Sequence, residues 1–148
     1  MPHTRSRHIV GLFRSSMKLS PLVGILGHRQ VGKTTLLEAF CATYHVLDRK
    51  EELAAARADP AGYLAARAGS GGVALDECQH APGLFPELKE WVRKHKAPGQ
   101  FVLSGSVRFT STESIRESLT GRILNLELYP MSVAELLGQP LPDFSLRA

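Results

Sequence analysis

Short apolar runs alternate along the chain with longer stretches in which apolar residues recur every three or four positions. The apolar runs predict five strands, at residues 22–26, 44–48, 73–75, 101–103 and 123–128. The amphipathic stretches predict helices at residues 7–17, 32–42, 51–58, 60–68, 84–95, 113–120 and 132–138. Strands that alternate with helices are typical of a parallel sheet covered on both faces, so the pattern predicts an α/β fold.

Two of the predicted strands carry less apolar surface than the middle of a parallel sheet requires. Residues 44–48 contain few apolar side chains, which suits an edge strand. Residues 123–128 alternate, with Leu124, Leu126 and Leu128 on one face and Asn125 and Glu127 on the other, as in a half-exposed strand. Both strands are therefore placed at the edges of the sheet.

The length of 148 residues and the hydrophobic content of 43% suit one globular domain with a single core. We assign residues 1–20 to a basic arm with a short helix that packs on the core, residues 21–138 to the core, and residues 139–148 to a tail. No apolar stretch approaches the roughly 20 residues that span a bilayer, so no membrane association is expected. Two cysteines do not make a disulfide framework, which favours the cytoplasm.

The positive charge of the chain, +4 in total, is concentrated near its N-terminus. Residues 1–37 contain no acidic residue, and their basic residues are Arg5, Arg7, Arg14, Lys18, Arg29 and Lys33. Such a segment suits a solvated arm, an organelle transit peptide or an arm that contacts DNA. We favour the solvated arm, and DNA association is kept as an alternative.

The segment between the first strand and the helix after it has the composition of a phosphate-binding loop. It reads glycine, four residues, glycine, lysine and threonine, and comprises Gly27, His28, Arg29, Gln30, Val31, Gly32, Lys33, Thr34 and Thr35. The glycines let backbone N–H groups approach phosphate, and the start of the helix adds its positive dipole end. Lys33 is expected to contact the β- and γ-phosphates, and the Thr34 hydroxyl to bind Mg²⁺.

An acidic pair ends the third predicted strand. Open α/β sheets bind ligands at the carboxyl ends of their strands, so Asp76 and Glu77 are candidates for the second half of the site. Asp76 is predicted to hold Mg²⁺ through the waters of the ion. Glu77 is predicted to deprotonate the water that attacks the γ-phosphate. The alternative is that the pair caps the following turn.

Three polar residues near the later strands are further candidates. Ser104 and Ser106 follow the fourth strand, where a hydroxyl can sense the γ-phosphate or hold the attacking water. We favour Ser106, with an ordinary turn serine as the alternative. Arg122 is a candidate arginine finger, acting in cis or on a neighbouring subunit, and a surface ion pair is the alternative.

Five segments together resemble the prokaryotic AAA-type ATPases of the archaeal-ATPase-like group: residues 26–36, 75–82, 84–89, 101–106 and 117–122. The resemblance implies a five-stranded parallel sheet of order 5-1-4-3-2 and a preference for ATP over GTP. It also implies the roles given above for Lys33, Thr34, Asp76 and Glu77, with a sensor between Ser104 and Ser106.

The chain departs from this family at three points. Proline is usual where His28 stands and threonine where Ser104 stands, and neither change removes a needed group. The C-terminal domain of the family does not follow residue 138, so we expect a truncated or stand-alone ATPase core.

The features together predict Mg²⁺-dependent ATP hydrolysis, with weak turnover by the isolated core. The alternative is a regulatory or interaction module that binds ATP and barely hydrolyses it, because no helical lid follows the fifth strand. A homo-oligomer is also left open.

Overall fold

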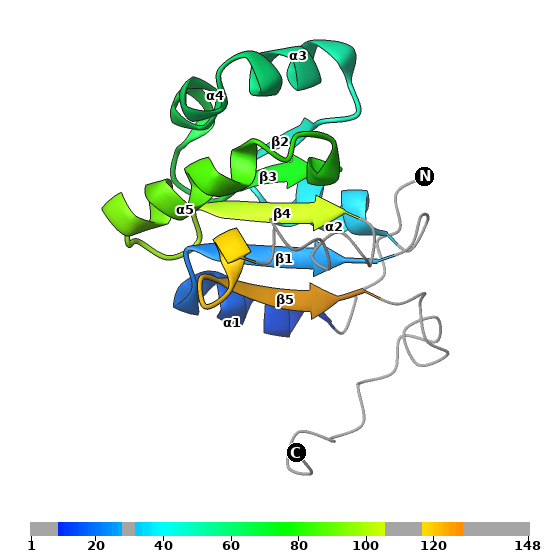
Figure 1. Cartoon of the computed structure of the whole chain (residues 1–148). Helices are drawn as coiled ribbons and strands as arrows, with labels where there is room; N and C mark the ends of the chain where they lie inside the picture. The colour runs from blue at the N-terminus through cyan, green and yellow to red at the C-terminus, as the bar shows by residue number, and fades with distance from the viewer. Residues whose placement is uncertain (1–8, 28–31, 106–116, 129–148) are drawn as a thin grey trace.

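The computed structural model describes residues 9–27, 32–105 and 117–128 of the chain. Five strands form one sheet in the order β2-β3-β4-β1-β5, and Figure 1 shows their arrows pointing the same way. The strands are β1 (Leu22–Leu26), β2 (Thr43–Val46), β3 (Val73–Asp76), β4 (Phe101–Gly105) and β5 (Ile123–Glu127). The predicted α/β fold, the order 5-1-4-3-2 and both edge strands are therefore confirmed.

The helices lie close to their predicted places. They are α1 (Ile9–Leu19), α2 (Lys33–Phe40), α3 (Lys50–Ala58), α4 (Pro60–Arg67) and α5 (Leu84–Lys94), with a short 3₁₀ helix, η1 (Cys78–His80). The helix predicted at 113–120 is described only from residue 117, and residues 117–119 are helical. The helix predicted at 132–138 and the tail at 139–148 lie outside the described residues.

The sheet divides the hydrophobic core into two layers. Side chains alternate along a strand, so Leu22 and Leu26 enter one layer while Val23 and Ile25 enter the other. Helices α3, α4 and α5 cover the first layer, and α1 and α2 cover the second (Figure 1). Burial on both faces explains why β1, β3 and β4 are almost wholly apolar, since every residue of these strands is buried.

The edge strand β5 is less covered than its alternation predicts. Leu126 and Leu128 are buried, whereas Leu124, which the alternation assigns to the same face, is 41% exposed. Leu124 lies near the start of the strand, where it lines an open groove together with Leu19 at the end of α1. Alternation determines the direction of a side chain, but not whether a helix covers that point of the sheet.

A polar cluster joins α3 to α4. Glu52 accepts a hydrogen bond from the Tyr63 hydroxyl at 2.6 Å and lies 3.3 Å from the Arg67 guanidinium and 3.7 Å from His45. The Arg67 guanidinium also stacks 3.7 Å above the Tyr63 ring. Burial raises the pKa of Glu52, but the hydrogen bonds from Tyr63 and Arg67 and the charge of Arg67 together lower this pKa below its ordinary value.

Glu52→Gln is expected to lower the melting temperature by about 2–4 °C at about pH 7 and by much less at about pH 3. The folded pKa of Glu52 lies below its unfolded value, so the carboxylate stabilises the fold fully above an unfolded pKa near 4.5. This stabilisation is lost as the pH falls through the folded pKa. Thermal melts followed by circular dichroism measure the effect. Glu90→Gln is the control, because Glu90 pairs with Arg93 at an exposed site. An equal loss at both pH values would contradict the expectation.

Candidate functional site

The loop after β1 leads into α2 through a glycine in a left-handed conformation. Gly32 precedes the helix with φ 96° and ψ 17°, a region that side chains disfavour, and no side chain caps the helix. The first backbone hydrogen bond of the helix runs from the Leu36 N–H to the Gly32 carbonyl at 3.0 Å. The N–H groups before Leu36 therefore have no acceptor within the helix and are available to an anion. His28, Arg29, Gln30 and Val31 lie outside the described residues.

Lys33 is buried although it carries a charge, with 8% of its surface exposed. Its Nζ atom donates a hydrogen bond of 2.9 Å to the carbonyl of Gly105, the last residue of β4. The amine is thus held at the carboxyl end of the sheet, next to the loop. Thr35, the last residue of the predicted loop, is exposed.

Four residues from four elements meet beside Lys33, and we call them the Asp76 cluster: Thr34, Tyr44, Asp76 and Ser104. Asp76 Oδ2 lies 3.4 Å from the Thr34 hydroxyl and accepts a hydrogen bond of 2.5 Å from the Tyr44 hydroxyl. Asp76 Oδ1 accepts a hydrogen bond from the Ser104 hydroxyl. The loop and the acidic pair, 42 residues apart, therefore lie at one end of the sheet.

The topology explains this meeting. Ala74 and Val102 enter the core layer beneath α1 and α2, so Asp76 and Ser104, two positions further along their strands, point to the same face. Tyr44 packs against the same layer from β2, the neighbour of β3. Helix α2 covers this face, and its first turn brings Thr34 onto the strand ends.

Glu77 adopts a backbone conformation that is rare for a residue with a side chain. Its φ is 55° and its ψ is 40°, and it is the one non-glycine residue with positive φ in the described residues. Its N–H donates to Asp76 Oδ1 at 2.9 Å, and its carboxylate accepts from Gln79 Nε2 at 2.6 Å. Gln79 Oε1 is buried and has no hydrogen-bond partner among the described residues. Such strain is common where the backbone serves a functional site.

Two residues of this region, Tyr44 and Gln79, could not be assigned to the site from the sequence. No spacing or motif connects Tyr44 to Asp76, and only the pairing of β2 with β3 brings them together. For Gln79 the sequence offers only a weak indication of a place in the site, namely its position two residues after Glu77. Of the two serine candidates, Ser104 lies against Asp76, and Ser106 lies outside the described residues.

Arg122 lies at the opposite end of the sheet. It precedes β5, whereas Asp76 ends the parallel strand β3 (Figure 1). A five-residue strand is roughly 16 Å long, which exceeds the reach of a side chain. The strand directions therefore place Arg122 and Asp76 at different ends of the sheet, which disfavours a role of Arg122 in cis. The role in a neighbouring subunit stays a prediction.

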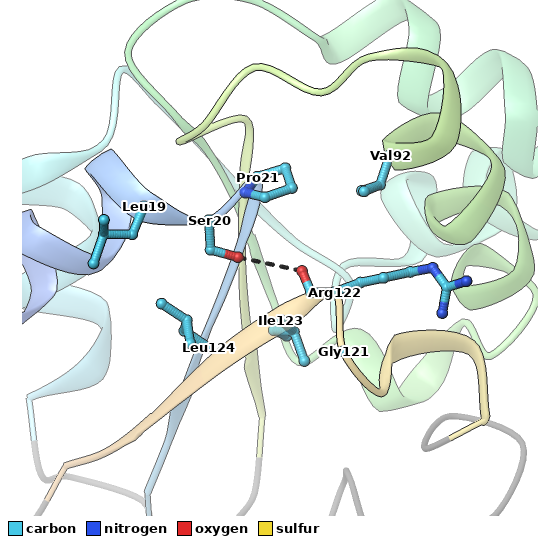
Figure 2. Close-up of a pocket in the computed structure, with 8 residues that line it drawn as sticks. All are labelled: Leu19, Ser20, Pro21, Val92, Gly121, Arg122, Ile123 and Leu124. Atoms are coloured by element: carbon cyan, nitrogen blue, oxygen red, sulfur yellow. Dashed lines mark hydrogen bonds between the residues drawn. The ribbon is translucent and has the colours of Figure 1, made fainter.

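Arg122 instead borders a groove of about 480 Å³, which Figure 2 shows with its lining residues Leu19, Ser20, Pro21, Val92, Gly121, Arg122, Ile123 and Leu124. The Ser20 hydroxyl donates to the Arg122 carbonyl at 3.3 Å, and the Arg122 guanidinium donates to the Thr120 carbonyl at 3.2 Å. The Ser20 contact links the residue after α1 to the start of β5, whereas the bond to Thr120 is local.

The donors of the Asp76 cluster suit Mg²⁺. Thr34 and Asp76 offer a hydroxyl and a carboxylate, the oxygen ligands that this ion prefers, and Mg²⁺ keeps several waters and phosphate oxygens rather than an all-protein cage. The described part of the chain contains no group of three or more histidine, cysteine, aspartate or glutamate side chains that could enclose a metal. Burial and the bond to Asp76 raise the pKa of Tyr44, so its hydroxyl stays protonated and acts as a donor.

A parallel sheet in this order, with a glycine-bounded loop between the inner strand β1 and the helix α2, defines a P-loop NTPase-like α/β protein. The sequence profile of the AAA domain matches residues 19–137, and the chain belongs to this family. The predicted AAA-type resemblance is thereby confirmed, and with it a nucleotide-binding protein of the ATPase type.

Two curated relatives are similar to this chain, and both are described as uncharacterized proteins. One is from Mycobacterium bovis and one from Mycobacterium tuberculosis, and each is 34% identical over 133 residues, which is 88% of this chain. The chain spans 30% of the length of each relative. Within the described residues, no helix has the length and apolar character that crossing a membrane requires.

Proposed function

We propose that the chain binds ATP with Mg²⁺ at residues 27–35 and hydrolyses it, with an AAA-type core that extends over residues 21–138. The observation that carries the proposal is the separation of 3.4 Å between the Thr34 hydroxyl and Asp76 Oδ2. A Mg²⁺ ion on Thr34 would have the Asp76 carboxylate within reach of its waters. The ion would neutralise the charge of the phosphates and position them for attack.

The residues of the loop suit the binding of the triphosphate. The N–H groups from Gly27 to Thr35 donate to phosphate oxygens, and the helix start adds a favourable dipole. The amine of Lys33 exchanges the Gly105 carbonyl for the β- and γ-phosphates, which are stronger acceptors because they are charged. ATP rather than GTP is proposed because the chain belongs to the AAA domain family.

The surroundings of Glu77 suit a general base. Glu77 follows Asp76 directly and its N–H donates to Asp76 Oδ1, while its carboxylate accepts a hydrogen bond from Gln79. The buried Oε1 atom of Gln79, which has no partner in the described residues, is an acceptor that a water molecule can satisfy. We therefore assign Glu77 to the deprotonation of the attacking water and Ser104 or Ser106 to sensing the γ-phosphate.

A second function, ATP binding with very little hydrolysis, is favoured by one observation. Arg122 lies at the far end of the sheet, so it can contribute to hydrolysis only on a neighbouring subunit of a homo-oligomer. An isolated chain would then hold ATP and release phosphate slowly.

A reducing compartment such as the cytoplasm suits the two free cysteines, Cys41 and Cys78. For the N-terminal arm, Arg14 lies over the Phe40 ring at 4.9 Å, which supports packing rather than DNA contact.

The test is phosphate release by the purified chain with ATP and Mg²⁺, measured over many turnovers and at several chain concentrations. We expect release that needs Mg²⁺, exceeds one phosphate per chain, is faster with ATP than with GTP, and rises per chain with concentration if subunits assemble. Binding of a fluorescent ATP analogue without phosphate release would support the second function. Absence of nucleotide binding would contradict both.

A further inference from the structure

The carboxylate of Asp76 is approached by four donor groups in the described residues. A carboxylate offers about four acceptor positions, two on each oxygen. Ser104 and the Glu77 N–H donate to Oδ1, and Tyr44 and Thr34 approach Oδ2. The proposed role of Asp76, however, is to accept hydrogen bonds from water on Mg²⁺. A metal-bound water that reaches Oδ2 must therefore compete with the donors already there, of which Tyr44 is the nearest.

Three of the four donors are poorly placed to leave. Ser104 has no exposed surface and bonds to the other oxygen, Oδ1. The Glu77 N–H belongs to the backbone next to Asp76 and cannot turn away without moving the chain. Thr34 can continue to donate its proton to Asp76 while its oxygen lone pair binds the ion.

Tyr44 is the donor that can leave. It lies on the edge strand β2, its side chain is only partly buried, and its hydroxyl lies 2.5 Å from Asp76 Oδ2 and 3.5 Å from the Thr34 oxygen. The hydroxyl thus lies within hydrogen-bond range of both residues that would hold the proposed ion. Once displaced, it can turn to water because no further strand pairs with β2 in the described sheet.

We propose that the Tyr44 hydroxyl competes with metal-bound water for Asp76 Oδ2 and thereby sets the Mg²⁺ concentration at which the site loads. The inference rests on the proposed function, since it concerns the same site. Tyr44 acts through Asp76 and is a positioning residue: it keeps the carboxylate satisfied without the metal and opposes metal binding. Its loss should tighten metal binding, whereas the loss of a purely structural contact would loosen it.

Tyr44→Phe tests the competition, because it removes the hydroxyl and keeps the ring that packs against the core. The matched control is Tyr63→Phe, which removes a hydroxyl that donates to the Glu52 carboxylate at 2.6 Å, away from the Asp76 cluster. Mn²⁺ serves as the probe in place of Mg²⁺, and electron paramagnetic resonance measures its binding in the presence of ADP. We expect the half-saturating Mn²⁺ concentration to fall about tenfold in Tyr44→Phe and to stay at the wild-type value in Tyr63→Phe.

The outcomes separate this inference from the proposed function. Wild-type chain that binds no Mn²⁺ with nucleotide would overturn both. Wild-type binding with an unchanged or weaker affinity in Tyr44→Phe would overturn the competition and leave the proposed function standing.

A second measurement on the wild-type chain does not depend on the folding of the variant. Mn²⁺ and ADP should produce a tyrosine absorption difference that marks the release of a hydroxyl from a carboxylate, and the same difference should appear in Tyr63→Phe. Absence of this difference while Mn²⁺ binds would overturn the competition.

Discussion

Lys33→Ala is expected to weaken ATP binding by at least about a hundredfold and to abolish phosphate release. The amine is buried beside the loop and bonds only to the Gly105 carbonyl in the described residues, so it is ready to meet an anion there. Alanine removes the positive charge that Lys33 places next to the phosphates on the buried side of the site. Isothermal titration with a slowly hydrolysed ATP analogue measures the loss of affinity.

Lys94→Ala is the control for this variant, since Lys94 ends α5 and is exposed. It should bind the analogue as the wild-type chain does. Thermal melts should show that Lys33→Ala remains folded, because the lost bond to one carbonyl is worth only about 1 kcal/mol. Phosphate release at the wild-type rate by Lys33→Ala would refute the site proposed at residues 27–35.

Glu77→Gln is expected to lower phosphate release by about 10²–10⁴-fold while ATP affinity changes by less than about twofold. The amide cannot take a proton from water, but it has the size of the carboxylate and can still bond to Gln79. Single-turnover hydrolysis of bound ATP separates the chemical step from binding. An unchanged hydrolysis rate would show that Glu77 is not the base.

Glu77→Gly provides the control for folding. Glycine adopts a φ of 55° without the cost that a side chain imposes, so this variant should melt no lower than the wild-type chain. It should nevertheless be as inactive as Glu77→Gln, because it lacks the carboxylate. If the glycine variant is stable and inactive, the loss of hydrolysis is due to the missing carboxylate rather than to a damaged fold. A glycine variant that hydrolyses ATP normally would contradict the role of Glu77.

Much of the architecture could be predicted because each part depends on neighbours in the sequence. The apolar runs of β1, β3 and β4 reflect burial on both faces, and the weaker patterns of β2 and β5 reflect edges. The loop before α2 has its glycines and lysine within nine residues, so its place between strand and helix was readable from spacing.

The candidate site could be predicted only in part, because most of its contacts join distant segments. Asp76 was readable as the end of a buried strand, but its contacts with Tyr44 and Ser104 depend on which strands lie beside β3. Arg122 had the right residue type for an arginine finger, yet the direction of β5 places it at the other end of the sheet.

By itself, the sequence determined the class of this protein: the succession of strands and helices, the phosphate-binding loop and the acidic pair are all local patterns. Only the tertiary structure decided that Tyr44 reaches the carboxylate next to Thr34, that Arg122 is remote from it, and that Leu124 stays exposed. The physical reason is that periodicity determines which way a side chain points from its own element. What the side chain then meets depends on the order, direction and coverage of the strands around it.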